Sequence, residues 1–277
     1  MIFKRLPKTL IYFTLLCTSL TAMAQDEPWW VNYLVEKDSS FMGVTINMDY
    51  QYARPSYKNL LLVGSSTEKC YQNGFPTGQG LEDFYKFSDA TAPVVDSLTK
   101  NSLVGIITYK CTGIDVYYVK DTTNLRSSLS ALIKKDFSGA QNYIFIENDK
   151  KWDYYKRIYP GEVNDNFLMN QSFLNQLAYE GDDLGKQRKV SHWAYFKNDK
   201  NRSKFIDKIQ VLDFKVDTTR FIVNKNLPFE VELSRTDSIT PRNIEDITKL
   251  LTSLSLAYKG VYDGWGTEAV KEEEPNQ

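Results

Sequence analysis

Apolar residues recur with two distinct periods in the last third of the chain. Phe229, Val231 and Leu233 alternate with glutamates, which predicts a half-buried strand. Thr240-Pro241 then supplies a helix cap and a first-turn proline, and apolar residues at helical spacing follow until Gly260. Those apolar positions are Ile244, Ile247, Leu251, Leu254 and Tyr258. The pattern therefore predicts a strand followed by an amphipathic helix.

The neighbouring segments complete an order of six elements. The predicted segments are a strand over 190–196, a helix over 199–211, a β-rich stretch over 213–223, a turn over 224–228, a strand over 229–233, the helix after residue 240 and a last strand over 262–268. The order β-α-β-β-α-β closes as a four-stranded antiparallel sheet with both helices on one face, a ferredoxin-like sandwich.

A similar order is predicted in the first half of the chain. The segments are strands over 41–50 and 59–65, a helix over 81–100 that can break at Pro93, a hairpin of 103–109 and 114–120, a helix over 125–137 and a strand over 143–147. We find no residue-level similarity between the halves. The fold class is therefore predicted to be α+β, with two tandem α/β sandwich domains that share only the order of their elements.

Residues 165–179 carry an apolar stripe at helical spacing and predict a connector helix that packs on one or both domains. The acidic run 180–183 is too short for a calcium loop, and we expect a solvated linker with a mobile joint near 181–185. The predicted domains are an N-terminal domain over 25–162, a connector helix and linker over 163–186, a C-terminal domain over 187–270 and a charged tail over 271–277.

Residues 1–24 have the pattern of a cleaved secretory signal. Lys4, Arg5 and Lys8 precede an apolar run, which ends in the small-residue site Ala22-Met23-Ala24. No later apolar run reaches the roughly 18 residues that a membrane span needs. We expect an exported protein that begins near Gln25, in the periplasm of a Gram-negative bacterium.

The charge balance argues against a nucleic-acid partner. Removing the signal takes three of the 34 basic residues and leaves 31 against 35 acidic residues, a net charge near −4. A phosphate backbone is bound by clustered positive charge, and the sequence offers no such cluster.

The sequence predicts no catalytic, cofactor-binding or metal-binding residue. The chain has a single histidine, His192, so zinc sites built on two or three imidazoles are excluded. It also lacks a phosphate-binding glycine loop, a dinucleotide fingerprint and a nucleophile elbow. His192 can act as a general base, but its phase with Val190, Ala194 and Phe196 favours a hydrogen-bonded position on the packed face of its strand.

Two cysteines, Cys70 and Cys111, remain in the mature chain. Export permits a disulfide between them. The alternatives are two separate buried side chains, or a redox-active cysteine in an unrecognised envelope enzyme.

Aromatic side chains are predicted on the open face of the C-terminal sheet. Alternation places Trp193 and Tyr195 there, beside outward-facing glutamates that would repel a phosphate backbone. In the segment YDGWGTE, Trp265 stands between glycines and serves either as a core plug or as an exposed contact. The predicted protein-binding residues are Trp193, Tyr195, Glu230, Glu232, Tyr262, Asp263 and Trp265.

The segment YKGVYDGWGTE at 258–268, after an amphipathic helix, resembles the regulator of ribonuclease E activity B family. Its members are ferredoxin-like proteins that bind and inhibit ribonuclease E, and the resemblance covers about residues 187–270. It implies a protein-binding domain without an active site. The upstream part, with GDDLGKQRKVSHWAYF at the junction, is similar to the arrangement in which a domain of unknown function, family 695, comes first.

This chain departs from the cytoplasmic inhibitors because it carries a predicted export signal. An exported chain does not meet ribonuclease E, so the resemblance implies the fold and the habit of binding protein but a different target. We therefore expect a non-enzymatic regulatory protein with an unknown protein partner. The alternatives are an envelope hydrolase or redox protein that uses Cys70 or Cys111, and a purely structural envelope component.

Overall fold

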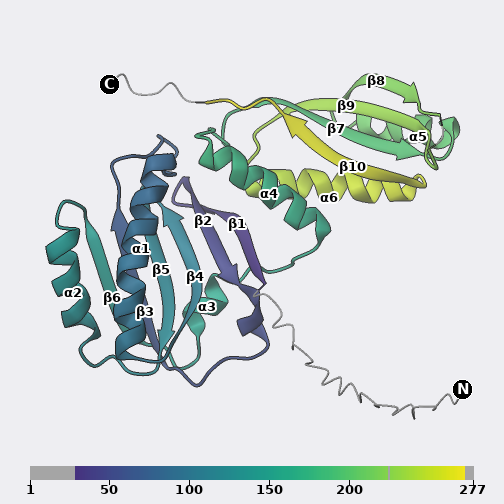
Figure 1. Cartoon of the computed structure of the whole chain (residues 1–277). Coiled ribbons are helices and arrows are strands. Elements are labelled where there is room, and N and C mark those ends of the chain that lie inside the picture. Colours follow the sequence, from purple (N-terminus) through teal and green to yellow (C-terminus); the bar gives the residue numbers. More distant parts are fainter. Residues whose placement is uncertain (1–28, 224, 272–277) are drawn as a thin grey trace, which may run out of the picture.

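The computed structural model describes residues 29–223 and 225–271. The predicted secretory signal at 1–24 and most of the predicted charged tail lie outside these residues. The described chain forms a six-stranded sheet followed by a four-stranded sheet, each with its own helices (Figure 1).

The N-terminal domain is an antiparallel sheet in the order β1-β2-β4-β5-β3-β6. Its strands are β1 (Trp30–Lys37), β2 (Ser40–Asn47), β3 (Asn59–Ser66), β4 (Asn101–Tyr109), β5 (Thr112–Val119) and β6 (Asn142–Asn148). Its helices are the 3-10 helix η1 (Met48–Gln51), α1 (Gly78–Leu98), α2 (Leu125–Asp136) and the short α3 (Asp153–Arg157).

Both faces of this sheet are covered. On one face, α1 and α2 bury a cluster that includes Phe87, Tyr117 and Leu129. On the other face, α3 and the preceding turn supply Trp152 and Tyr155, and Trp152 stacks on Tyr118 with ring centroids 3.8 Å apart. The central strands are therefore apolar on both sides, as expected for a sheet between two layers.

The C-terminal domain is an antiparallel sheet in the order β10-β7-β9-β8 with two helices on one face. Its elements are β7 (Arg188–Phe196), α5 (Asp199–Gln210), β8 (Lys215–Phe221), β9 (Phe229–Asp237), α6 (Pro241–Ala257) and β10 (Gly260–Thr267). Thr240 caps α6 by accepting a hydrogen bond from the Asn243 amide, and proline opens the helix, as the sequence predicts.

The two domains share one strand order. Each domain contains a β-α-β-β-α-β unit whose strands lie in the sheet in the order fourth, first, third, second. This order is β6-β3-β5-β4 in the N-terminal unit and β10-β7-β9-β8 in the C-terminal unit. The N-terminal sheet adds the β1–β2 hairpin beside β4. The predicted α+β fold with a ferredoxin-like C-terminal domain is confirmed.

Two N-terminal elements differ from their predictions. β1 was not predicted: Val31 and Tyr33 face the sheet core, and on the other side Leu34 contacts the connector helix. The helix α1 continues through Pro93 instead of breaking there. Pro93 lies on the exposed side of the helix, where the carbonyl that loses its partner can bond to water.

The predicted connector helix is α4 (Asp165–Tyr179), and it packs on both domains (Figure 1). It lies against β1 on one side and against α6 and β10 on the other. Residues of both domains join it in one apolar cluster: Leu34, Phe75, Leu174, Leu177, Ala178, Leu184, Val190, Ile239 and Ile244. The domains are therefore joined through a shared core.

Polar side chains of α4 form hydrogen bonds with groups in each neighbouring domain. The Gln171 side chain accepts a hydrogen bond from the Leu34 amide of β1 at 2.8 Å. The buried Asn170 accepts from the indole of Trp265 at 2.8 Å and donates to Thr248 of α6 at 2.9 Å. Trp265 also packs edge-on against Phe173, with centroids 4.8 Å apart. Trp265 is thus partly buried, and it holds the last strand against the connector.

The acidic run after α4 is not the solvated linker that its composition predicts. Asp182 is fully buried and forms an ion pair with Arg188 at 2.6 Å. The same carboxylate accepts the Val270 amide at 2.7 Å, and Asp183 pairs with the Val270 carbonyl. A buried carboxylate needs such partners, and they fix the segment between the domains.

A loop of the N-terminal domain fastens the same junction. Cys70 and Cys111 are joined by a disulfide, which ties the loop after β3 to the β4–β5 turn. The Asn73 side chain donates to the Ala178 and Asp182 carbonyls. Gly181 has a φ of +84°, and the ring of Tyr71 occupies the place where a β-carbon would lie.

His192 lies inside the C-terminal core. It is fully buried, and its Nδ1 lies 2.9 Å from the Tyr262 hydroxyl. Burial and then the charge of Arg235 lower the pKa of His192 to about 3. The side chain is therefore neutral near pH 7 and does not face solvent as a general base would.

Replacing Asn170 by alanine is expected to lower the free energy of unfolding by about 2 kcal/mol, because the indole of Trp265 and the Thr248 hydroxyl would both lose a buried partner. Urea unfolding followed by circular dichroism measures the change. The matched control is Gln176→Ala on an exposed position of α4, which should change stability by less than about 0.5 kcal/mol. Equal losses in both variants would contradict the bridging role of Asn170.

The neutral His192 predicts a specific loss of stability in acid. Between the unfolded pKa near 6.5 and the folded pKa near 3, the unfolded chain binds a proton that the folded chain does not. Stability must therefore fall as the pH falls through this window. Relative to His192→Asn, the wild type should lose about 3 kcal/mol more between pH about 7 and about 4. Parallel pH profiles of the two proteins would show that His192 does not contribute.

Candidate functional site

Trp193 and Tyr195 lie half-buried on the face of the C-terminal sheet opposite α5 and α6. β7 places them there by alternation with His192, Ala194 and Phe196, which face the helices. The ring of Trp193 lies across Gly266 of β10, where a β-carbon would come within 3.4 Å of the indole. The Trp193 ring therefore packs over the second glycine of the YDGWGTE segment.

A groove of about 460 Å³ opens beside Trp193. Its walls come from β7, from the end of β10 and from the segment that follows β10. The groove is lined by Arg188, Lys189, Ser191, Trp193, Gly266, Thr267, Glu268, Ala269 and Val270. An aromatic wall beside polar groups is the usual form of a place where a partner inserts one side chain.

The predicted glutamates are held by an arginine instead of standing free. Arg220 of β8 lies 3.5 Å from Glu230 and 3.6 Å from Glu232, and Glu230 is only 4% exposed. Tyr195 donates a hydrogen bond to the Glu230 carboxylate, and Lys225 lies 4.8 Å above the Tyr195 ring. Burial, then this hydrogen bond and the charges of Glu230 and Asp263, raise the pKa of Tyr195 to about 12. The tyrosine is therefore a neutral donor near pH 7.

The structure separates the seven predicted binding residues into two sets. A β-bulge in β10 between Tyr262 and Gly264, with a φ of +128° at the glycine, leaves Asp263 exposed near Tyr195. Tyr262 and Trp265 face the helices, where they contact His192 and Asn170. We define the open-face patch as Trp193, Tyr195, Glu230, Glu232 and Asp263, together with Val261, which pairs with Tyr195.

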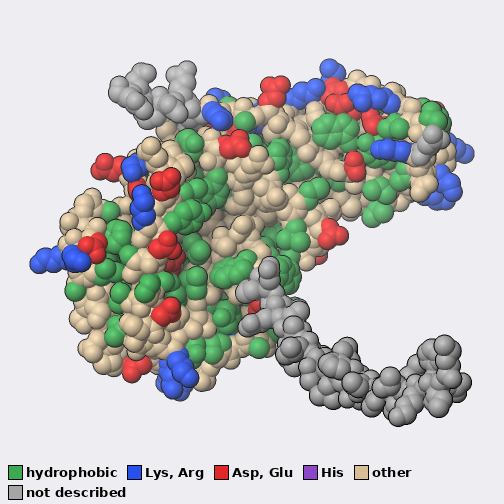
Figure 2. Space-filling model, in the orientation of Figure 1, with side chains coloured by type: hydrophobic (Ala, Val, Ile, Leu, Met, Phe, Trp, Pro, Cys, Tyr) green, Lys and Arg blue, Asp and Glu red, His purple; other side chains and the backbone are tan. Residues whose placement is uncertain are grey.

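On the face that Figure 2 shows, Lys and Arg side chains lie among Asp and Glu side chains on the C-terminal domain. This mixture of charges agrees with the charge balance of the sequence. It is unlike the one-signed surface that attracts a phosphate backbone.

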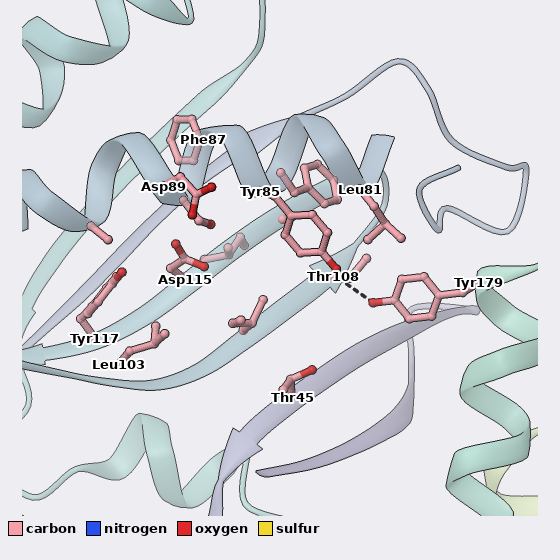
Figure 3. A pocket seen from close by; sticks show the side chains of 16 residues that line it. Thr45, Leu81, Tyr85, Phe87, Asp89, Leu103, Thr108, Asp115, Tyr117 and Tyr179 are labelled. Carbon is pink, nitrogen blue, oxygen red and sulfur yellow. Dashed lines mark hydrogen bonds between the residues drawn. The ribbon is translucent and has the colours of Figure 1, made fainter. Parts of the chain in front are cut away.

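A second concave site lies in the N-terminal domain, and the sequence did not indicate it. A pocket of about 300 Å³ opens between α1 and the strands β2, β4 and β5, and Tyr179 of the connector helix reaches its edge (Figure 3). Its walls are largely apolar. They include Leu81, Phe84, Tyr85, Phe87, Ala92, Leu103, Ile106, Ile114, Tyr117 and Tyr179.

Two carboxyl groups meet in this pocket. Asp115 reaches from β5 towards α1, where Asp89 lies (Figure 3). Asp115 is 4% exposed, and its Oδ2 atom has no hydrogen-bond partner among the described residues. Burial raises the pKa of Asp115 to about 6, and the charge of Asp89 adds to this effect. A hydrogen bond with Ser88 acts in the opposite direction.

One sequence signal could have revealed Asp115. It shares a face of β5 with Tyr117 and Val119, both of which are buried under the helices. A carboxylate in phase with buried residues of a central strand needs a partner, and such positions are common at functional sites. Within the described chain, no group of three or more histidine, cysteine or acidic side chains is placed to hold a metal ion.

Comparisons with known proteins assign both parts of the chain to families. Residues 29–159 match the family model described as "Family of unknown function (DUF695)", and residues 168–267 match the model described as "Regulator of ribonuclease activity B". The second match begins inside α4, upstream of the boundary predicted at residue 187.

No curated protein matches the chain. Among solved structures, the "Crystal structure of putative glycine cleavage system transcriptional repressor" aligns over 77% of this chain and 100% of that chain, with 7% identity and a TM-score of 0.22. This similarity is too weak to indicate a shared fold or function. The two family matches agree with the order of domains that the sequence predicts. The chain thus joins a domain of unknown-function family 695 to a C-terminal domain of the regulator of ribonuclease activity B family.

Proposed function

We propose that this protein is a non-enzymatic regulator that binds another protein through the open-face patch of its C-terminal domain. The family description names a regulator of ribonuclease activity, which supports a regulatory role based on protein binding. The observation that carries the proposal is the half-exposed pair Trp193 and Tyr195 on an uncovered sheet face, next to a groove.

The N-terminal domain leaves this patch accessible. α4 and β1 approach the C-terminal domain from the helix side of its sheet, so the junction is made by α6 and by Trp265. The opposite face of the sheet carries Trp193 and Tyr195. Domain packing therefore uses one face of the sheet and leaves the other for a partner.

The chemistry of the patch specifies the kind of partner segment. The apolar strip of Val261, Tyr195 and Trp193 favours an aliphatic or aromatic side chain that enters the groove. Arg220 already forms ion pairs with both glutamates within the protein. It contributes to the choice of partner more than to the strength of binding.

We also propose that the regulator works outside the cytoplasm, so that its target is not ribonuclease E. The signal-like pattern of residues 1–24 supports this location. The Cys70–Cys111 disulfide supports it too, because such bonds persist in oxidising compartments. Within the described residues, no helix has the length and apolar character that crossing a membrane requires.

Site-specific photo-crosslinking in living cells tests the binding surface. With Trp193→p-benzoylphenylalanine, a partner seated on the patch should be trapped as one defined product that mass spectrometry can identify. The matched control is the same substitution at Val211, which is 71% exposed at the end of α5. Binding of the purified partner should then weaken by about tenfold or more in Trp193→Ala and stay unchanged in Val211→Ala.

Crosslinked products that are the same from both positions would remove the open-face patch as the binding surface. So would a partner that binds Trp193→Ala as tightly as the wild type, provided that the variant keeps its melting temperature.

Cell fractionation with thiol labelling tests the proposed export. The protein released by osmotic shock should begin at Gln25, and Cys70 and Cys111 should react with a maleimide only after reduction. Leu15→Arg, which interrupts the apolar run, should keep the protein in the cytoplasm with reactive thiols, whereas Thr18→Ser should be exported normally. Wild-type protein found intact in the cytoplasm would refute the proposed location.

A further inference from the structure

The pocket under α1 combines a largely apolar hollow with a buried acid. Tyr85 and Phe84 come from α1, Tyr117 comes from β5, and Tyr179 comes from α4, where its hydroxyl lies 3.1 Å from that of Thr108 (Figure 3). The volume of about 300 Å³ is in the range of small-molecule sites. The pocket is thus built from α1, from strands of the sheet and from the connector helix.

The position of Asp115 has no evident structural purpose. An ion pair would justify a carboxyl group in this core, as Arg188 does for Asp182, but the charge that acts on Asp115 is the like charge of Asp89. Its Oδ2 atom is buried, and no described residue forms a hydrogen bond with it. A buried acceptor without a donor costs free energy, so a ligand that brings a donor or a positive charge would be favoured here.

The aromatic walls and the two carboxyl groups restrict the chemical class of ligand that fits the pocket. Aromatic faces attract cations as well as apolar groups, and two carboxyl groups repel anions. A neutral apolar molecule would fill the space but leave the Asp115 oxygen unpaired. We propose that the N-terminal domain binds a small organic amine, with its ammonium group at Asp115 and Asp89 and its apolar body against the aromatic walls.

The groups around Asp115 also determine the charge that a ligand would meet in the pocket. Near neutral pH the carboxyl group is largely ionised even with its pKa raised to about 6. The charged and titratable groups that face it are Asp89 from α1 and Tyr117 from its own strand, with the Ser88 hydroxyl as a donor. An incoming ammonium therefore meets a net negative site.

Isothermal titration calorimetry on the full mature chain near neutral pH tests the proposal with defined probes. The amines are 2-phenylethylamine and cyclohexylmethylamine, and each is compared with its neutral isostere, 2-phenylethanol or cyclohexylmethanol. At least one amine should bind about tenfold more tightly than its alcohol, because only the amine supplies a charge-assisted hydrogen bond. Phenylacetate, an anion of similar size, should not bind.

Asp115→Asn should lower the affinity for the amine by about tenfold or more and bring it close to that of the alcohol. This variant removes a poorly paired buried charge, so the folded state is retained, and a thermal melt checks it. Asp136→Asn, on an exposed position of α2, is the matched control and should bind like the wild type.

Three results would overturn the proposal: neither amine binds the wild type, the alcohols bind as tightly as the amines, or Asp115→Asn binds the amine unchanged. None of these results bears on the open-face patch, because the two sites lie in different domains on different faces. Any of these results would mean that Asp115 is a buried carboxyl group that binds no amine.

Discussion

The burial of α4 between the two domains is the constraint on which the rest of the structure depends. One side of this helix completes the packing of β1, and another completes that of α6 and β10. Exposing either side would leave leucines and an aromatic ring in water, at about 25 cal/mol for each Å² of apolar surface. The polar groups at the centre, Asn170 and Gln171, are buried with partners, so they select one arrangement of the two domains.

The same strand order is used in two ways. In the N-terminal domain, α3 and the turn before it cover the second face of the sheet, and a pocket lies beneath α1 on the first face. In the C-terminal domain, the second face stays open and carries aromatic side chains. One topology therefore provides a concave site suited to a small molecule and an exposed sheet face suited to a protein.

Much of this architecture could be predicted from periodicity, because most strands and helices pack through one face. The alternation in β7 and β9 and the apolar stripe of α6 gave the C-terminal fold and the open-face residues directly. Prediction was weaker where a residue's partner is far away in sequence. Asp182 stands in a run that reads as a linker, but Val270, 88 residues later, helps to fix it in the core.

Trp265 and Asp115 show the same limit. The sequence left Trp265 as a plug or an exposed contact, and the choice depended on Asn170, which lies 95 residues away. The bulge at Gly264 shifts the register of β10 by one residue, and a shift of one residue moves a side chain to the other face. Asp115 was missed because its strand is buried on both faces, so an acid there breaks no simple alternation.

The contact between Asn170 and Trp265 also sets an order of events on the ribosome. The N-terminal domain and α4 leave the exit tunnel well before β10 does, because β10 is the last strand of the described chain. Until that strand arrives, the side of α4 that carries Phe173 lacks its final cover. Domains usually fold as units during synthesis, starting from the N-terminus, and an apolar surface exposed in the meantime invites aggregation. That side of α4 therefore stays exposed until β10 has emerged and packed against it.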